Sequence, residues 1–496
     1  MSQPRTWIRT LSMALLGMPL LLAATAPAPA AGQGAVTPRN VIFILSDDHR
    51  YDFMGFHPNA PEWLETPNLD RMAREGAHLV NAFVTTALCS PSRASILTGR
   101  YAHNHRVVDN SSPIPPGTIF FPEHLQRAGY ATGYFGKWHM GEDAQSDQPR
   151  PGFDRWVSFR GQGTYFDPLL NIDGERRQME GYTSDILTDF ALEWLDELRG
   201  EGGDRPFFLY LAHKAVHAEF EPAPRHAGRY AEAAIPYPAS MANVESNYRG
   251  KPAWVREQRN SWHGVDYMYH GQFDFDTFYR QYAETLLGLD ESVGRVLDYL
   301  ERTGLDRNTL VIYMGDNGFL LGEHGLIDKR NAYEESMRVP MLAYAPGWIA
   351  PGTRITQLIR NIDVAPTLLE LAGAPVPEEM DGHSVLPVFT GGDIPQEAEM
   401  LYEYYWEYAF PHTPTTLALR EDRYKYIFYH GVWDVNELYD LQTDPHEMVN
   451  LVHVPAYRDE VNRMRQRLFQ RLEETDGMVI PLKPAGTFQA AERELP

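Results

Sequence analysis

Cys89 is the one cysteine in this chain of 496 residues, and it opens the run Cys-Ser-Pro-Ser-Arg-Ala-Ser-Ile-Leu-Thr-Gly-Arg at residues 89–100. A single thiol has no disulfide partner in the chain and no second sulfur ligand for a thiolate metal site. We therefore expect Cys89 to carry chemistry of its own.

The residues around Cys89 predict an anion site at the start of a helix. Ser90 is expected to cap a helix whose first position is Pro91 and which ends at Gly99. Cys89 would then precede the helix, and Arg93 would lie in its first turn. Backbone amides, the helix dipole and a guanidinium can face one anion there, which predicts a pocket of sulfate size.

Two acidic pairs predict a metal site. Asp47-Asp48 and Asp316-Asn317 supply three carboxylates and an amide oxygen. These are hard ligands that suit calcium or magnesium and match zinc poorly, and we favour calcium. Because both pairs follow apolar runs, we expect them to lie together with Cys89.

Basic side chains follow two further apolar runs. Lys137 and His139 alternate, so both can point into one site if Trp138 packs away from it. His213 and His217 follow another run.

The elements that must position these residues are strands. Continuous apolar runs at residues 40–45, 130–135, 206–211 and 309–314 are typical of strands buried on both faces of a parallel sheet. Helical patterns at 183–198 and 278–302 lie between them, so the chain reads as α/β. Ligands bind beyond the carboxyl ends of such strands, where the four polar clusters are expected to converge.

The pattern changes from about residue 391. Short antiparallel strands are predicted at 415–419, 424–429 and 437–441, followed by an amphipathic helix at 457–474. We therefore predict a catalytic domain over 32–390 and a smaller C-terminal α+β domain over 391–496. The segment 237–276 is predicted to be an irregular insertion near the active-site face, whose aromatic residues either contact substrate or pack a long loop.

Residues 1–31 have the pattern of a secretory signal: Arg5 and Arg9 precede an apolar stretch that ends in small residues. We expect an exported protein, periplasmic or secreted, without a membrane anchor. The formal net charge of −23 argues against nucleic acid as a partner, because phosphate binding needs a basic face.

The runs at 89–100 and 129–141 resemble the two signatures of type I sulfatases, in the alkaline phosphatase superfamily. The resemblance extends from Asn40 to the segment 437–451. It implies an alkaline-phosphatase-like large domain, with a mostly parallel central sheet flanked by helices, and a smaller C-terminal domain with an antiparallel sheet and a helix.

The resemblance also implies two groups needed for activity. A formylglycine-generating enzyme would convert Cys89 to formylglycine (3-oxoalanine). A Ca²⁺ ion would be held by residue 89 together with Asp47, Asp48, Asp316 and Asn317.

The implied reaction is cleavage of a sulfate ester. The formylglycine hydrate at position 89 would attack sulfur, while Arg93, Lys137 and Lys329 hold the sulfuryl oxygens. The resemblance favours His217 over His213 as the site residue, with a supporting role for His213. His217 would protonate the leaving oxygen, and His139 would act as the base that releases sulfate.

The substrate is predicted from two shorter similarities. Residues 101–110, with His103, His105 and Arg106, are similar to the corresponding stretch of N-acetylglucosamine-6-sulfatases, which favours a 6-O-sulfated hexosamine. The alternative is that this stretch only supports the catalytic helix. His324, in a run similar to iduronate-2-sulfatases, either contacts substrate or packs its loop. Glycosaminoglycans, mucin glycans and algal polysaccharides all remain open as sulfated carbohydrate substrates.

Two other functions remain open from the sequence. A phosphonate or phosphate monoester hydrolase can use the same cysteine signature and metal. A non-catalytic glycan-binding protein would result if Cys89 stays unmodified.

Overall fold

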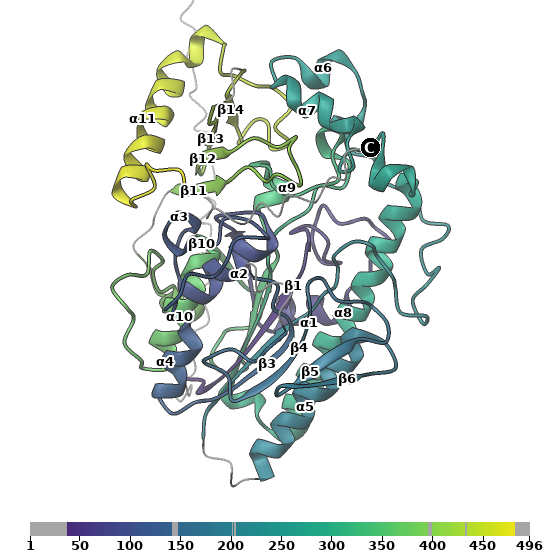
Figure 1. The fold of residues 1–496 in the computed structure, drawn as a ribbon, viewed down its shortest axis with the longest axis vertical. Helices are drawn as coiled ribbons and strands as arrows, with labels where there is room; N and C mark the ends of the chain where they lie inside the picture. Colours follow the sequence, from purple (N-terminus) through teal and green to yellow (C-terminus); the bar gives the residue numbers. More distant parts are fainter. Residues whose placement is uncertain are drawn as a thin grey trace, which may run out of the picture.

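The computed structural model describes residues 37–140, 147–200, 202, 205–394, 399–431 and 434–481. The predicted signal at 1–31 lies outside these residues. Figure 1 shows a large lower part built on one sheet and a smaller upper part that contains a second sheet and α11. Within the described part of the chain, no helix has the length and apolar character needed to cross a bilayer.

The large sheet has ten strands in the order β10-β2-β9-β8-β1-β7-β3-β4-β5-β6. Its centre is parallel, because β1 pairs in parallel with β7 and β8, and β3 with β7 and β4. The strands are β1 Asn40–Ser46, β2 Ala77–Phe83, β3 Ala131–Lys137, β4 Arg155–Phe159, β5 Leu169–Ile172, β6 Glu175–Gln178, β7 Phe207–Ala212, β8 Thr309–Gly315, β9 Met341–Tyr344 and β10 Thr353–Arg360. The four predicted parallel strands are confirmed as β1, β3, β7 and β8.

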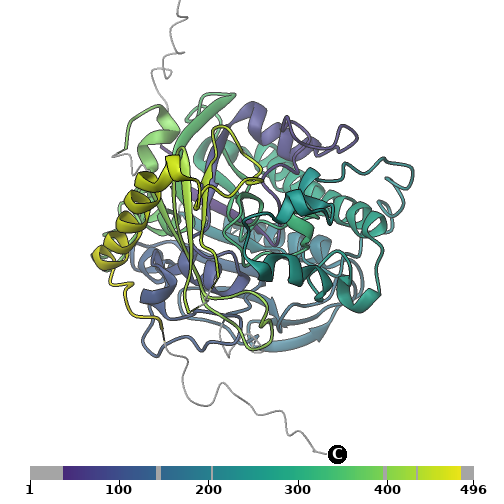
Figure 2. The same cartoon turned by 90° about the horizontal axis from the view of Figure 1, so that it is seen from above.

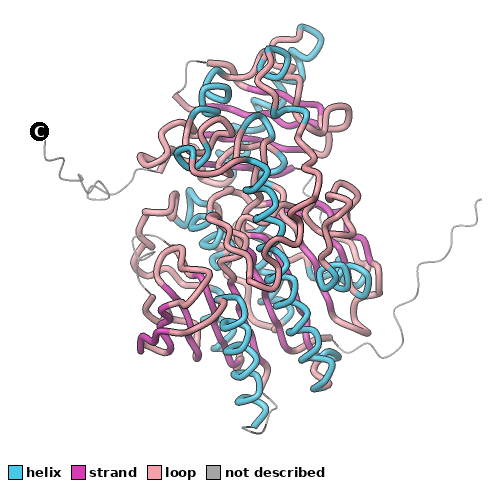
Figure 3. Tube along the Cα trace, turned by 90° about the vertical axis from the view of Figure 1, so that its right-hand side faces the viewer, coloured by secondary structure: helices cyan, strands magenta, loops and turns pink. Residues whose placement is uncertain are grey.

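Helices cover both faces of this sheet. Alternate residues of β1 explain why, since Val41 and Phe43 join the core on one face while Ile42 and Ile44 join the core on the other. Figure 3 shows long helices running alongside the strands in the lower part of the molecule. The α-helices are α1 Pro67–Glu75, α2 Cys89–Thr98, α3 Ala102–His105, α4 Phe121–Arg127, α5 Thr183–Gly200, α6 Glu245–Tyr248, α7 Ala253–Glu257, α8 Phe275–Thr303, α9 Glu334–Met337, α10 Val364–Leu371 and α11 Arg458–Glu474.

The second sheet is antiparallel, in the order β11-β12-β13-β14. Its strands are β11 Glu399–Tyr404, β12 Thr416–Glu421, β13 Tyr424–Tyr429 and β14 Glu437–Asp440. Helix α11 packs on it through Met464, Leu468 and Leu472. Figure 2 shows this helix, in yellow, alongside the sheet. The predicted α/β fold with a smaller antiparallel sheet and a closing helix is therefore confirmed, and β11 is the strand of this sheet that the sequence analysis missed.

Candidate active site

Four neighbouring strands of the large sheet deliver the polar clusters to one edge. The strand order β8-β1-β7-β3 places the loops that follow these strands side by side. Asp47 follows β1, Asp316 follows β8, His213 follows β7, and Lys137 ends β3. Because the strands are parallel, their carboxyl ends meet at the same edge, and the predicted convergence is observed.

Helix α2 begins two residues earlier than predicted. It starts at Cys89, its N-cap is Leu88, and no side chain caps it. Ser90 is therefore not the cap; its hydroxyl donates instead to the carbonyl of His139 at 2.5 Å, which ties the helix to the loop after β3. The predicted end is confirmed, since Gly99 has a φ of 67° in the left-handed region.

The Cys89 thiol is fully buried beside opposite charges. Its Sγ lies 3.5 Å from Asp47 Oδ1, and Lys329 Nζ donates to it at 3.2 Å. Burial, with the negative charge of Asp47, raises the pKa of Cys89 to about 12. The unmodified thiol is thus held protonated, which makes it a poor nucleophile in this position.

Three carboxylates converge next to Cys89. Asp47, Asp48 and Asp316 each offer an oxygen, and these oxygens lie within 4.8 Å of one another. Burial and the negative charge of Asp47 raise the pKa of Asp48. The same two causes raise the pKa of Asp316 to about 7. The buried Oδ1 of Asn317 has no hydrogen-bond partner among the described residues. Clustered carboxylate oxygens beside an amide oxygen that lacks a hydrogen-bond partner are suitable ligands for a hard divalent cation.

Three cations surround these carboxylates. Arg93 donates to Asp316 Oδ2 at 2.9 Å and to the carbonyl of Lys137 at 2.6 Å. Lys137 pairs with Asp47, and Lys329 pairs with Asp48. Burial alone would raise the pKa of Asp47, but Lys137 and the other cations hold it well below its usual range.

Two histidines face the same site. His139 has a left-handed φ of 45°, and its Nε2 accepts from the Gln162 amide at 3.3 Å. His217 Nδ1 donates to the carbonyl of Ala218 at 2.5 Å, and its Nε2 lies 3.8 Å from Asp48. Burial and nearby lysines hold the pKa of both rings well below the usual value, so both are neutral at pH 7.

A pocket of about 590 Å³ opens above these groups, with Asp48, His139, His217 and Lys329 in its lining. Lys214 also lines it, and burial together with the charge of Lys137 lowers the pKa of Lys214 to about 8. The sequence analysis missed Lys214, although its position between His213 and His217 in the same loop was the available signal.

Comparison with known proteins fits this geometry. The family model described as Sulfatase matches residues 39–374, which is more than half of the chain, and a model described as N-sulphoglucosamine sulphohydrolase, C-terminal, matches residues 322–474. The chain belongs to the sulfatase family. As a sulfatase, it is a sulfuric ester hydrolase.

Several relatives of this sulfatase cover most of its length. An N-acetylglucosamine-6-O-sulfatase of Bacteroides thetaiotaomicron is 33% identical over 493 residues, covering 88% of this chain and 86% of the relative. The N-acetylglucosamine-6-sulfatase of Homo sapiens is 31% identical over 463 residues, covering 83% and 80%. A structure of a protein bound to its substrate D-glucosamine-2-N,6-O-disulfate is similar with a TM-score of 0.81 and 31% identity, covering 90% of this chain and 100% of the other.

One similar structure comes from another class of hydrolase. A phosphonate monoester hydrolase from Silicibacter pomeroyi has a TM-score of 0.74 at 23% identity, covering 88% of this chain and 95% of the other. At that identity the likeness concerns the fold alone.

Two predicted substrate-binding histidines of the sulfatase lie away from the pocket. His103 is buried, with Nδ1 2.7 Å from Glu403 and Nε2 2.7 Å from the carbonyl of Thr475, so it joins α3 to the C-terminal part. His105 is buried against Ser95, 3.0 Å away. Neither lines the pocket that contains Lys329. Their placement corresponds to the supporting role that the sequence analysis left open.

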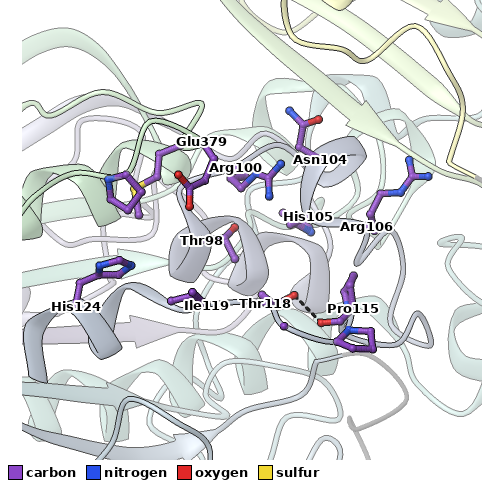
Figure 4. Close-up of a pocket in the computed structure, with 14 residues that line it drawn as sticks. Thr98, Arg100, Asn104, His105, Arg106, Pro115, Thr118, Ile119, His124 and Glu379 are labelled. Carbon is purple, nitrogen blue, oxygen red and sulfur yellow. Dashed lines mark hydrogen bonds between the residues drawn. The ribbon is translucent and has the colours of Figure 1, made fainter. Parts of the chain in front are cut away.

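The two remaining predicted contacts are also placed elsewhere. Arg106 lines, with His105, a separate cavity of about 280 Å³ around Thr98 and Arg100, near the end of α2 (Figure 4). Cys89 begins that helix, so about 14 Å of helix separates the two ends. His324 is buried, and its ring centroid lies 4.1 Å from that of Tyr333, which corresponds to loop packing.

Proposed function

We propose that this sulfatase removes sulfate from a 6-O-sulfated hexosamine in a sulfated carbohydrate. The observation that carries the proposal is the position of Cys89, buried at the start of α2 between Asp47 and Lys329, below an open pocket. The sugar comes from the relatives in Bacteroides thetaiotaomicron and Homo sapiens, which are N-acetylglucosamine 6-sulfatases aligned over most of this chain.

Two groups would complete the site. Asp47, Asp48, Asp316 and Asn317 would hold Ca²⁺, which supplies Lewis-acid polarisation of a sulfate oxygen when bound. Cys89, converted to formylglycine by a formylglycine-generating enzyme, would supply an oxygen nucleophile in place of a thiol whose deprotonation is disfavoured.

The side chains of the chain itself have separable roles. Arg93, Lys137 and Lys329 place positive charge around the position where the sulfuryl oxygens would lie, and Lys214 adds charge in the pocket wall. Their mutual arrangement is fixed by ion pairs with the carboxylates, so little reorganisation is needed when an anion binds.

Proton transfer is assigned to the histidines. His217 Nδ1 donates to a backbone carbonyl, which leaves Nε2 as the atom that exchanges a proton with the leaving oxygen. A bound sulfate anion would raise the low pKa of His217, because it adds negative charge beside a buried ring. His139 is assigned as the base, since its ring is neutral and reaches the pocket.

We also propose that the protein is exported. The signal pattern at 1–31 would carry the chain to the periplasm or the medium, where sulfated polysaccharides are met.

The test is sulfate release from N-acetylglucosamine-6-sulfate by protein coexpressed with a formylglycine-generating enzyme and supplied with Ca²⁺. We expect release by the native protein, and a loss of roughly 10⁴-fold or more in Cys89→Ala, which removes the nucleophile. Mass spectrometry of the peptide that contains residue 89 should give a mass below that of the thiol form. Turnover of aryl phosphonates in preference to any sulfate ester would contradict the proposal.

A further inference from the structure

We propose that a cleft beside the active-site pocket is a second saccharide subsite that holds an uncharged sugar unit next to the sulfated one. This inference rests on the proposed function. The cleft has a volume of about 520 Å³ and is called here the aromatic cleft. Its walls are formed largely by the rings of Trp262, His263, Tyr267, His270, Phe410 and His412.

The aromatic cleft is continuous with the active-site pocket. Trp262, His263 and Phe410 line both spaces. A substrate whose sulfated unit lies near Lys329 would therefore extend its next unit along these three side chains. In Figure 1 the segment that carries α6 and α7 lies beside the C-terminal sheet. Residues of 258–270 and of 409–413 both line the cleft.

The shared wall is built before any ligand arrives. The rings of Trp262 and Phe410 are stacked with centroids 5.6 Å apart, and His263 stacks on Phe410 at 4.8 Å. Arg330 covers Phe410, with its guanidinium carbon 4.0 Å from the ring centroid, and is itself paired with Glu407 at 2.7 Å. A fixed aromatic face costs little conformational entropy when a sugar ring packs on it.

The chemistry of the aromatic cleft selects a neutral ligand. No lysine, arginine, aspartate or glutamate lines it in the described part of the chain. Burial and the charge of Arg330 hold the pKa of His263 well below its usual value, so this ring is neutral. A sulfated or carboxylated sugar needs cationic partners, whereas a neutral pyranose offers an apolar C–H face to aromatic rings.

One buried polar side chain, Gln258, lines the aromatic cleft. Gln258 is 2% exposed, and its amide nitrogen donates to Asp328 at 3.4 Å and to Thr413 at 3.3 Å. Its Oε1 is buried and has no hydrogen-bond partner among the described residues. An unsatisfied buried acceptor is costly, and a sugar hydroxyl would satisfy it.

The experiment compares two substrates that share the sulfated unit. One is N-acetylglucosamine-6-sulfate, and the other carries a neutral hexose attached to the same unit. We expect a higher kcat/KM for the disaccharide in the native protein. Tyr267→Ala and His412→Ala, which alter only the aromatic cleft, should each lower kcat/KM for the disaccharide about fivefold and leave the monosaccharide unchanged.

Tyr408→Ala is the matched control, because Tyr408 is an exposed aromatic residue of the same loop as His412 that does not line the cleft. It should change neither substrate. Equal losses on both substrates in the cleft variants, or no loss on the disaccharide, would overturn the inference.

Failure of the proposed function is distinguishable. If the native protein hydrolyses neither substrate, calorimetry with an unsulfated neutral disaccharide tests the cleft directly. Binding that Tyr267→Ala weakens would support the subsite, and absence of binding would overturn it.

Discussion

Two of the buried charge clusters in the described part of the chain differ in whether they border the active-site pocket. The site cluster sets Asp47, Asp48 and Asp316 against Arg93, Lys137 and Lys329. The inter-sheet cluster, between the large sheet and the C-terminal sheet, sets Glu334, Glu437 and Glu447 against Arg420, Lys425 and Lys251.

The charges of the inter-sheet cluster are paired with one another. Arg420 forks onto Glu334 at 3.0 and 3.2 Å, and the Glu334 backbone amide donates to Glu447 at 2.8 Å. Tyrosine hydroxyls, including those of Tyr333 and Tyr429, donate to Glu437. The site cluster instead borders the active-site pocket, which Asp48 and Lys329 line. Since its carboxylates are already balanced by cations, an added divalent ion makes the site net positive. That explains how a chain of net charge −23 can receive an anionic ester.

The largest effect is expected from breaking the ion pairs of the inter-sheet cluster. Glu334→Ala leaves the buried Arg420 without its carboxylate partner and removes one of the two partners of Lys425, which keeps Glu447. We expect the free energy of unfolding to fall by about 3–5 kcal/mol, with kcat of the folded fraction unchanged. Urea unfolding and single-temperature assays measure the two quantities. Glu334→Gln, which keeps the shape of the side chain, serves as the control. A loss of kcat in Glu334→Ala without a loss of stability would contradict the separate roles of the two clusters.

Calcium removal should affect only the site cluster. At a Ca²⁺ concentration of 100 times Kd, binding stabilises the folded chain by about 2.7 kcal/mol, so a chelator should lower Tm by the corresponding amount. Asp316→Asn should reduce this calcium-dependent shift, whereas Glu447→Gln should keep it. An equal calcium response in native protein and Asp316→Asn would show that the ion binds elsewhere.

A smaller effect concerns pH. Burial raises the pKa of Asp316 from an ordinary 3.8 to about 7 and that of Glu447 from 4.5 to about 7. Raised values mean that each group stabilises the fold fully below its unfolded pKa and loses that contribution as pH rises towards 7.

The measurement is Tm against pH between about 4 and 8. Metal-free protein should lose stability as the pH rises across this window. Ca²⁺ should remove the part due to Asp316, because the ion replaces the proton, and Glu447→Gln should remove the rest. A profile that rises with pH in the metal-free Glu447→Gln protein would contradict the sign.

The strands β1, β3, β7 and β8 could be predicted from the sequence, because strands buried on both faces are continuous apolar runs. The polar residues directly after these runs could be predicted as site residues, because ligands bind beyond the carboxyl ends of parallel strands. The sequence could not show whether the residues that follow α2 lie near the first or the last turn of this helix. His105 and Arg106 were therefore expected at the site, although they lie near Thr98 in the last turn. The cap was misplaced because Ser90 found a distant acceptor, the His139 carbonyl, in place of its own helix. Likewise, no local pattern brings Phe410 to Trp262, since their contact depends on packing between the insertion and the second sheet.

The pairing of Arg330 with Glu407 has a consequence for the order in which the protein is made. Arg330 adjoins Lys329 and supports Phe410, yet its partner Glu407 follows β11. A growing chain therefore contains Cys89, the carboxylates and the lysines before it contains Glu407 and Phe410. We expect the pocket wall at Phe410 to form only after translation has passed β11.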